Sequence, residues 1–221
     1  MVLKWCNYQL FLHSSIYKKL NLYLIHKHNL NILKNYNLLL FKITILKFPC
    51  RCPKLKYLTK FLEINGKNLK EVYIKECGNN LYLSIAKFCP NLKKLFVSVI
   101  DNYGLDMLKT IFNSCQDLEG IVILCRERFS NEKEVLKTVA NHSPKKFCEL
   151  KLINSELLLE DLESFFINWE NRASKKSISL IFIDDYNNSL EYMKIIEKYK
   201  NLGVIKKFET GMYYYDDDLY L

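Results

Sequence analysis

The side chains best suited to metal binding in this chain form two closely spaced pairs. His26 and His28 form one pair, and Cys50 and Cys52 form the other. Imidazole and thiolate groups are the ligands that structural zinc sites use most often, so these four groups have the chemistry to hold one ion. Their spacing matches none of the usual zinc motifs, however. We therefore expect these side chains to be unligated, and the sequence predicts no metal site.

Two groups of carboxylates are the next candidates for cation binding. Asp184–Asp185 and Asp216–Asp218 lack the spacing of an EF-hand loop and its distal glutamate, so we interpret both as solvated chain. Tyr213–Tyr215 directly precede the second group. The acidic tail that contains them, 211–221, has the composition of a short partner-binding segment. A frayed or loosely docked terminus is the interpretation we favour.

The sequence contains no recognisable catalytic motif. Its six glycines are isolated, which excludes a phosphate-binding loop, and no Gly-x-Ser-x-Gly, His-Glu-x-x-His or Cys-x-x-Cys is found. His142 is expected to lie at the end of a helix rather than to act in catalysis. The sequence therefore predicts no catalytic residue and no cofactor, and we expect a non-enzymatic protein.

Length and charge favour one compact domain with a solvated basic surface. The chain has 221 residues, 49% of them hydrophobic, which is enough to bury a sizeable core. Its net charge of +9 arises from 33 Lys and Arg against 24 Asp and Glu. The lysines are scattered and form no long basic run. A nucleic acid or an anionic membrane surface is therefore the less favoured partner.

The eight cysteines do not resemble a disulfide framework. A chain of this size does not need disulfides for stability. The sequence shows no convincing signal peptide, and its longest uncharged stretch near the N-terminus is too short and too polar to span a bilayer. We therefore expect reduced thiols and a cytoplasmic or nuclear location.

A short apolar unit recurs along the middle of the chain and sets the architecture. Its apolar residues stand at positions 1, 4 and 6, in four copies: Leu69, Val72, Ile74; Leu92, Leu95, Val97; Leu118, Ile121, Ile123; and Phe147, Leu150, Leu152. The copies begin 23, 26 and 29 residues apart. This period and pattern are typical of leucine-rich repeats. RCPKLKYL at 51–58 is interpreted as an earlier restart of the same pattern.

Helical patterns separate these units. Apolar spacing predicts helices over 81–88, 105–112, 133–142, 159–169 and 189–200, and a further strand over 178–182. Asn131 and Glu134 have the spacing of a capping box, and Gly203 is placed to adopt the left-handed conformation that ends a helix. Cys89-Pro90 predicts a corner at which a helix ends and the chain turns into the next strand.

The strand face opposite the helices is the predicted binding surface. In each unit, the residue between the second and third apolar positions projects away from the core. These residues are Tyr73, Phe96, Val122 and Lys151, with Ile181 as a further member. An apolar ladder on a face that should contact water is typical of a binding site, and Lys75, Lys94 and Lys151 favour an acidic protein partner. The alternative is that the N-terminal segment or the tail folds over this face.

Several of the repeated stretches resemble the cysteine-containing leucine-rich repeats of F-box/LRR proteins. AKFCPNLKKL and the later SCQDLEGI carry the resemblance, and its most specific stretches are NGKNLKEVYI, AKFCPNLKKLF and LGVIKKF. The resemblance covers roughly residues 51–208. It implies an RNI-like repeat fold that serves as the substrate-recognition half of a Skp–cullin–F-box ubiquitin ligase. The F-box, the helical module that binds the Skp-type adaptor in that family, is not recognisable in residues 1–48.

These observations predict an α/β leucine-rich-repeat solenoid, with parallel strands on the concave face and helices on the convex face. The predicted segments are 1–50, poorly ordered or a truncated or replaced F-box region, then the repeat domain 51–210 and the tail 211–221. The predicted function is protein–protein interaction, with a Skp-type adaptor as partner only if an F-box is supplied. The alternatives are a stand-alone repeat scaffold unrelated to ubiquitin and, less favoured, a basic polyanion-binding module.

Overall fold

The computed structural model describes residues 2–5, 8–15, 19–24, 42–48, 54–74, 79–99, 102–125, 132–155, 157–174, 176–183 and 190–211. Its strands are β1 (Val2–Trp5), β2 (Tyr8–Ser15), β3 (Lys19–Leu24), β4 (Lys42–Phe48), β5 (Glu71–Ile74), β6 (Lys94–Val99), β7 (Gly120–Cys125), β8 (Glu149–Ile153), β9 (Ile178–Ile183) and β10 (Ile205–Gly211). Its helices are α2 (Leu55–Asn65), α3 (Asn79–Phe88), α4 (Asn102–Ser114), α5 (Glu132–His142), α6 (Leu159–Glu170) and α7 (Leu190–Asn201), with a 3-10 turn η2 (Gly66–Asn68) after α2. From β4 onward strands and helices alternate, which confirms the predicted α/β class.

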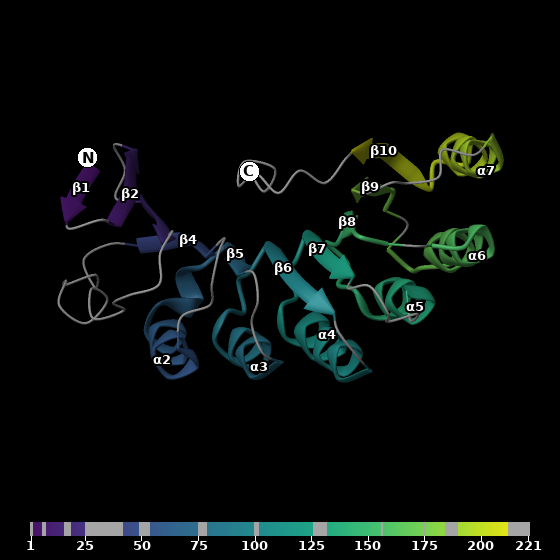
Figure 1. The fold of residues 1–221 in the computed structure, drawn as a ribbon. Helices are drawn as coiled ribbons and strands as arrows, with labels where there is room; N and C mark the ends of the chain where they lie inside the picture. Colours follow the sequence, from purple (N-terminus) through teal and green to yellow (C-terminus); the bar gives the residue numbers. More distant parts are fainter. Residues whose placement is uncertain are drawn as a thin grey trace.

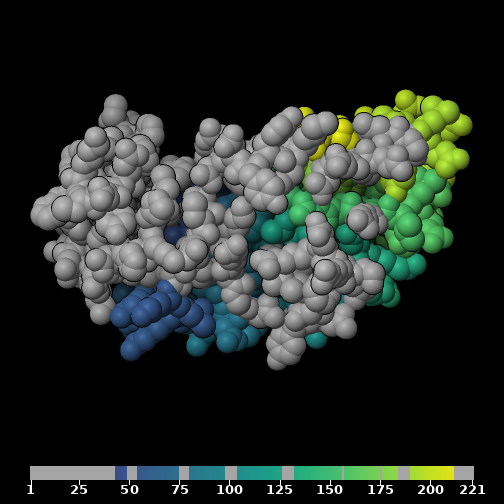
Figure 2. All heavy atoms as spheres, viewed as in Figure 1, coloured from purple at the N-terminus to yellow at the C-terminus, as the bar shows by residue number. Residues whose placement is uncertain are grey.

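The ten strands form one sheet whose spatial order is the order of the chain. β4 to β10 are parallel throughout, and β3 is also parallel to β4. β1, β2 and β3 pair antiparallel. Parallel neighbours require a crossover connection, and each helix from α2 to α7 supplies one. These helices form one layer on a single face of the sheet, and the strands lie on the inner side of the curved molecule (Figure 1). In the space-filling view the helices occupy its lower and right-hand margin (Figure 2).

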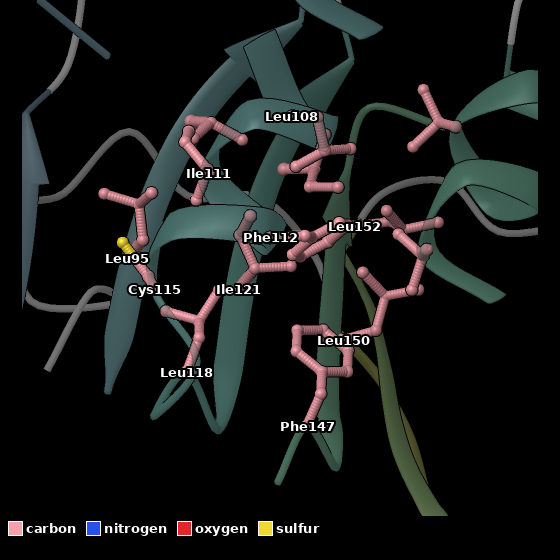
Figure 3. Close-up of a cluster of buried hydrophobic side chains, with 14 of the residues drawn as sticks. Leu95, Leu108, Ile111, Phe112, Cys115, Leu118, Ile121, Phe147, Leu150 and Leu152 are labelled. Carbon is pink, nitrogen blue, oxygen red and sulfur yellow. The ribbon is translucent and has the colours of Figure 1, made fainter. Parts of the chain in front are cut away.

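The apolar residues of each repeated unit are buried between the sheet and the helices, as predicted. Leu92 and Leu95 are 0% and 2% exposed, and their counterparts in the other three units are buried to the same degree. Side chains of α4 and of strands β6 to β8 form one contiguous cluster (Figure 3), in which the rings of Phe112 and Phe147 meet edge to face at 5.7 Å. Burying one such side chain contributes roughly 1.5–3 kcal/mol, so these contacts hold strand and helix layers together.

The corner between helix and strand is built as the cysteine pattern predicts. Cys89 donates its backbone N–H to Ile85 O at 2.9 Å, and Cys115 donates to Ile111 O at 2.8 Å, so each cysteine closes the last turn of a helix. Both cysteines are fully buried. The thiol Sγ of Cys115 donates to the carbonyl of Cys89 at 3.4 Å and so links one corner to the next.

One restart predicted from the sequence was wrong. The stretch 51–58 leads into helix α2 rather than into a strand, because Leu58 and Leu62 are four residues apart and bury the same helical face. The strand that precedes α2 is β4, whose Ile43 and Leu46 are fully buried. The repeat domain was predicted to start at residue 51, but the sheet already includes strands before that residue.

The remaining elements agree with the sequence in part. Strand β9 and the helices α3 to α7 match the predicted ranges to within a few residues. Gly203 has a φ of 74° after α7, which confirms its predicted role. Asn131 lies outside the described residues, so the capping box stays a prediction. The described parts of residues 1–48 are all strand. Within the described part of the chain, no helix has the length and apolar character required to cross a bilayer.

Candidate protein-binding groove

The strand register aligns five of the residues predicted to face away from the helices, together with Lys47 of β4, in one row, which we call the inner row. It consists of Lys47, Tyr73, Phe96, Val122, Lys151 and Ile181, on β4 to β9. The rings of Tyr73 and Phe96, on neighbouring strands, lie with their centroids 4.5 Å apart. Because side chains alternate between the two faces of a strand, the row projects away from the helices. The alternation of side chains along a strand, used in the sequence analysis, therefore assigned Tyr73, Phe96, Val122, Lys151 and Ile181 to the correct face.

The prediction that this apolar face contacts water was wrong at its two aromatic residues. Tyr73 is 7% exposed and Phe96 is 2% exposed. They belong to a second, smaller hydrophobic cluster with buried Ile153 and Ile183, against which Val122, Leu124 and Ile181 pack while partly exposed. The alternative considered from the sequence was that the N-terminal segment 1–50 or the tail 211–221 covers this face; residues 25–41 and 212–221 of these segments lie outside the described residues. Lys75 also lies outside them.

A groove of about 300 Å³ lies along the inner row. Its floor is apolar where Tyr73, Phe96 and Val122 line it. It is bordered by Lys47 at one end and by Lys151 and Ile181 at the other, and its wall carries Glu71, Lys94, Gly120 and Glu149. These last four residues form a second row, the charged row, because the register pairs Glu71 with Lys94, Lys94 with Gly120 and Gly120 with Glu149.

The charged row contains an ion pair that spans three strands. Lys94 Nζ lies 3.0 Å from Glu149 Oε1, although Gly120 of β7 stands between them in the sheet. A Cβ atom at Gly120 would lie 3.2 Å from both Cβ and Oε1 of Glu149. The absence of a side chain at position 120 therefore leaves the space through which the two charged groups meet. Lys94 is thus paired within the sheet while its side chain stays exposed, and its contact with a partner stays a prediction.

The two lysines of the inner row are half-buried, and burial lowers the pKa of each. For Lys47 the desolvation is opposed by the nearby carboxylate of Glu71. For Lys151 it is opposed by Glu149 and Glu209, while Lys94 lowers the pKa further. Removing an ammonium group from water disfavours its charged form, and the neighbouring carboxylates offset part of this effect at both positions.

Some of the remaining candidates from the sequence are described by the structure, and the others lie outside the described residues. His142 is the exposed last residue of α5, as expected for a helix terminus. Cys89, Cys115 and Cys125 are buried thiols that take part in no disulfide. Among the described residues, no three His, Cys, Asp or Glu side chains gather as a metal ion would require. The two His and Cys pairs of the N-terminal half, the two aspartate clusters and Cys77 lie outside the described residues.

Sequence reasoning missed part of the groove for identifiable reasons. Glu71, Gly120 and Glu149 stand two positions before inner-row residues. Every second residue of a strand points to the same face, so extending the prediction by two residues toward the N-terminus of each strand would have found them. Lys47 could not be found in this way, because β4 lacks the repeat pattern and was not predicted as a strand.

Comparison with known proteins assigns no family to the chain. No protein-family model matches it, and no curated protein matches its sequence. The chemistry of the groove is therefore the basis for any function: an apolar floor with ammonium groups at both ends and an internally paired wall. This arrangement suits non-covalent recognition of an extended, partly apolar ligand.

Proposed function

We propose that the protein is a non-enzymatic protein-interaction module of the leucine-rich-repeat type, and that its inner-row groove binds the partner. The groove carries this proposal, because the partly exposed side chains of Val122 and Ile181 offer apolar contact area on the face opposite the helices, beside the buried rings of Tyr73 and Phe96. Apolar side chains gathered on a face that is otherwise lined by charged residues are typical of a binding surface.

The periodicity of the backbone supports a repeat solenoid. The carbonyl oxygen of Lys70 accepts hydrogen bonds from the backbone N–H groups of Lys93 and Lys94, at 2.7 and 3.0 Å. The carbonyls of Lys93 and Glu119 each accept two bonds in the same way from the following unit. Each unit thus contacts mainly its neighbours, which is the defining property of solenoid repeats.

The resemblance to F-box/LRR repeats suggests a more specific role, as the substrate-recognition half of a Skp–cullin–F-box ubiquitin ligase. A stand-alone scaffold is the second candidate. Affinity capture followed by mass spectrometry separates the two. Co-purification of a Skp-type adaptor and a cullin supports the ligase role, whereas their repeated absence alongside a groove-bound partner supports the scaffold.

The groove itself is tested by two matched substitutions from an apolar residue to aspartate. Val122→Asp places a charge in the groove, and Leu83→Asp places one on α3, where Leu83 is 44% exposed on the helical face. We expect captured partners to be lost from the Val122→Asp protein and retained by Leu83→Asp. Circular dichroism and thermal melts establish that both variants are folded, and Ile181→Ala provides a milder groove variant. Partner capture that survives both groove changes would contradict the proposal.

A further inference from the structure

Strand β10 is the last strand of the sheet, and one of its two sides has no described neighbour. It pairs in parallel with β9 and, among the described residues, with no other strand. Figure 1 shows it in yellow at the end of the sheet, next to α7. The outer side of an edge strand presents a row of backbone N–H and C=O groups, which can form hydrogen bonds with a further strand.

The two faces of β10 carry different side chains. Glu209 pairs in register with Ile181 of the inner row, so Glu209 and Lys207 lie on the face opposite the helices. The charged groups of these two residues are 2.7 Å apart, and their side chains are 46% and 56% exposed. Phe208 lies on the helical face, where its ring meets that of Phe182 edge to face at 5.6 Å, yet Phe208 is only half-buried. The strand thus has a partly covered ring between two opposite charges.

The order of these charges favours one register for an antiparallel pair of β10 strands from two copies of the chain. A twofold axis perpendicular to the sheet keeps both helix layers on the same face, and it sets one residue opposite its own counterpart. Centring the pair on Lys206, Lys207 or Glu209 would oppose like charges, which is destabilising. Centring it on Thr210 leaves Lys207 and Phe208 with no opposite residue in the strand. Centring it on Phe208 sets Lys207 of each copy opposite Glu209 of the other.

We propose that two copies of the chain associate through β10, in an antiparallel pair centred on Phe208 that continues the sheet from one copy into the other. The two Phe208 rings then cover apolar surface that one copy leaves half exposed, and cross-strand pairs of Lys207 with Glu209 stabilise the register. Lysine at a sheet edge ordinarily discourages pairing, so this charge order restricts the edge to a strand that offers glutamate opposite it. Both copies use the same residues, so the interface closes as a dimer. The inference is independent of the inner-row groove.

Sedimentation velocity of the full chain over a range of concentrations tests the dimer. One strand pair buries less area than a standard protein interface, so we expect a reversible monomer–dimer equilibrium in the micromolar range. Glu209→Lys should weaken self-association about tenfold or more, because lysines would then face each other, and Lys207→Glu should weaken it equally. Glu63→Lys on α2 is the matched control, since Glu63 also lies 2.7 Å from a lysine and is 49% exposed. We expect this control to dimerise like the unsubstituted protein.

Mixing the two charge variants tests the register. In an equimolar mixture of the Glu209→Lys and Lys207→Glu proteins, the lysines of one face the glutamates of the other, so we expect a heterodimer. The double variant Lys207→Glu, Glu209→Lys restores opposite charges and should dimerise by itself. Circular dichroism establishes that each variant is folded.

Four results would overturn the inference. They are a full chain that stays monomeric at every concentration, a dimer that persists in both single variants, a mixture that forms no heterodimer, and a dimer that appears only after residues 212–221 are removed. In the last case the tail of the chain itself would be the occupant of the edge.

Discussion

The corner shared by successive units shows how closely single residues are fitted. Gly66 stands three residues before Leu69, as Cys89 stands three before Leu92 and Cys115 three before Leu118. Each of these corner residues accepts a hydrogen bond from the N–H of the leucine that follows. At Gly66 the unit stacked beside the corner, rather than the local backbone, leaves no room for a side chain.

Gly66→Ala tests this stacking. Gly66 has ordinary helical angles, φ −56° and ψ −36°, so alanine would cause no backbone strain. An added Cβ would however lie 2.4 Å from Phe88 O and 3.1 Å from Cys89 Sγ. We expect a loss of about 1–3 kcal/mol in the free energy of unfolding, measured by chemical denaturation, because backbone atoms of α3 must move.

Gly203→Ala is the control for that change. No atom lies within 4 Å of a Cβ at Gly203, but its φ of +74° disfavours a side chain. The expected cost is roughly 1–2 kcal/mol and comes from backbone strain alone. Hydrogen exchange should therefore report a disturbance at the C-terminal end of α3 only in Gly66→Ala. An undisturbed α3 together with unchanged stability in that variant would contradict the close corner contact.

The two corner thiols predict a specific dependence of stability on pH. Burial raises the pKa of Cys89 from 9.0 to about 12, with a smaller contribution from the nearby Cys115, and burial likewise raises that of Cys115 to about 12. In the unfolded chain these thiols ionise near pH 9, whereas in the folded protein they stay protonated until about 12. The folded state therefore binds more protons in this window, and its stability falls as pH rises from about 9 toward 12.

The double variant Cys89→Ala, Cys115→Ala isolates this contribution. Lysines also titrate in this pH range, but both proteins contain the same lysines. The difference between the two proteins in the slope of unfolding free energy against pH therefore reports the thiols. We expect the double variant to lose less stability than the unsubstituted protein from about pH 9 to about 12, measured by urea denaturation. Slow alkylation of both native thiols is the second expected result. Equal slopes together with rapid alkylation would contradict their buried position.

At the scale of elements, each strand–helix unit depends on its neighbours for burial and for polar contacts. Arg172, in the turn after α6, donates to Ser143 Oγ and Ser143 O at 2.6 Å each, and its guanidinium carbon lies 4.1 Å from the centre of the Trp169 ring. This single side chain joins the corner of one unit to the corner of the next. Exposed Lys–Glu and Lys–Asp pairs also cross between units, but pairs of this kind contribute little individually.

Leu95→Ala tests the interface between strand β6 and its helices. Leu95 is 2% exposed, so truncation should leave a cavity and cost about 2–5 kcal/mol of unfolding free energy. Leu83→Ala on the exposed face of α3 should change stability by less than about 0.5 kcal/mol. Hydrogen exchange in Leu95→Ala should increase in β5 and β7 as well as in β6, because the units stabilise one another. A thermal melt unchanged by Leu95→Ala would contradict the repeat register.

At the scale of the whole molecule, one hydrophobic cluster runs from Ile43 near the first repeated unit to Ile205 in β10. The described residues form one further, smaller cluster, in which Tyr73 and Phe96 of the inner row pack with Ile153 and Ile183. The sheet is likewise continuous from β1 to β10. Continuity of sheet and core favours a single cooperative unit.

This continuity predicts that distant substitutions act on the same unfolding transition. Leu46→Ala in β4 should shift the fluorescence transition of Trp169, which is buried in α6 and donates from Nε1 to Lys176 O at 2.7 Å. A Trp5→Phe background removes the second tryptophan of the chain. We expect the fluorescence and circular dichroism transitions to coincide and to move together. Separate transitions at the two ends would contradict one cooperative unit.

The sequence by itself determined the repeated elements and their orientation. Apolar spacing located β9 and helices α3 to α7, and the parity of each unit assigned Tyr73 and Phe96 to the face opposite the helices. These features follow from local periodicity, since a helix and a strand each repeat side-chain direction at a fixed interval. Periodicity failed at α2 and β4, where Leu and Lys occur at spacings compatible with either element.

Only the tertiary structure decided how the candidate site is arranged. Tyr73 and Phe96 face away from the helices yet are buried, and Lys94 is paired with Glu149 across Gly120. Both outcomes depend on which distant side chains meet on neighbouring strands. The sequence of one unit does not specify these contacts. Local pattern therefore fixed the direction of each side chain, and packing between units fixed its exposure and its partner.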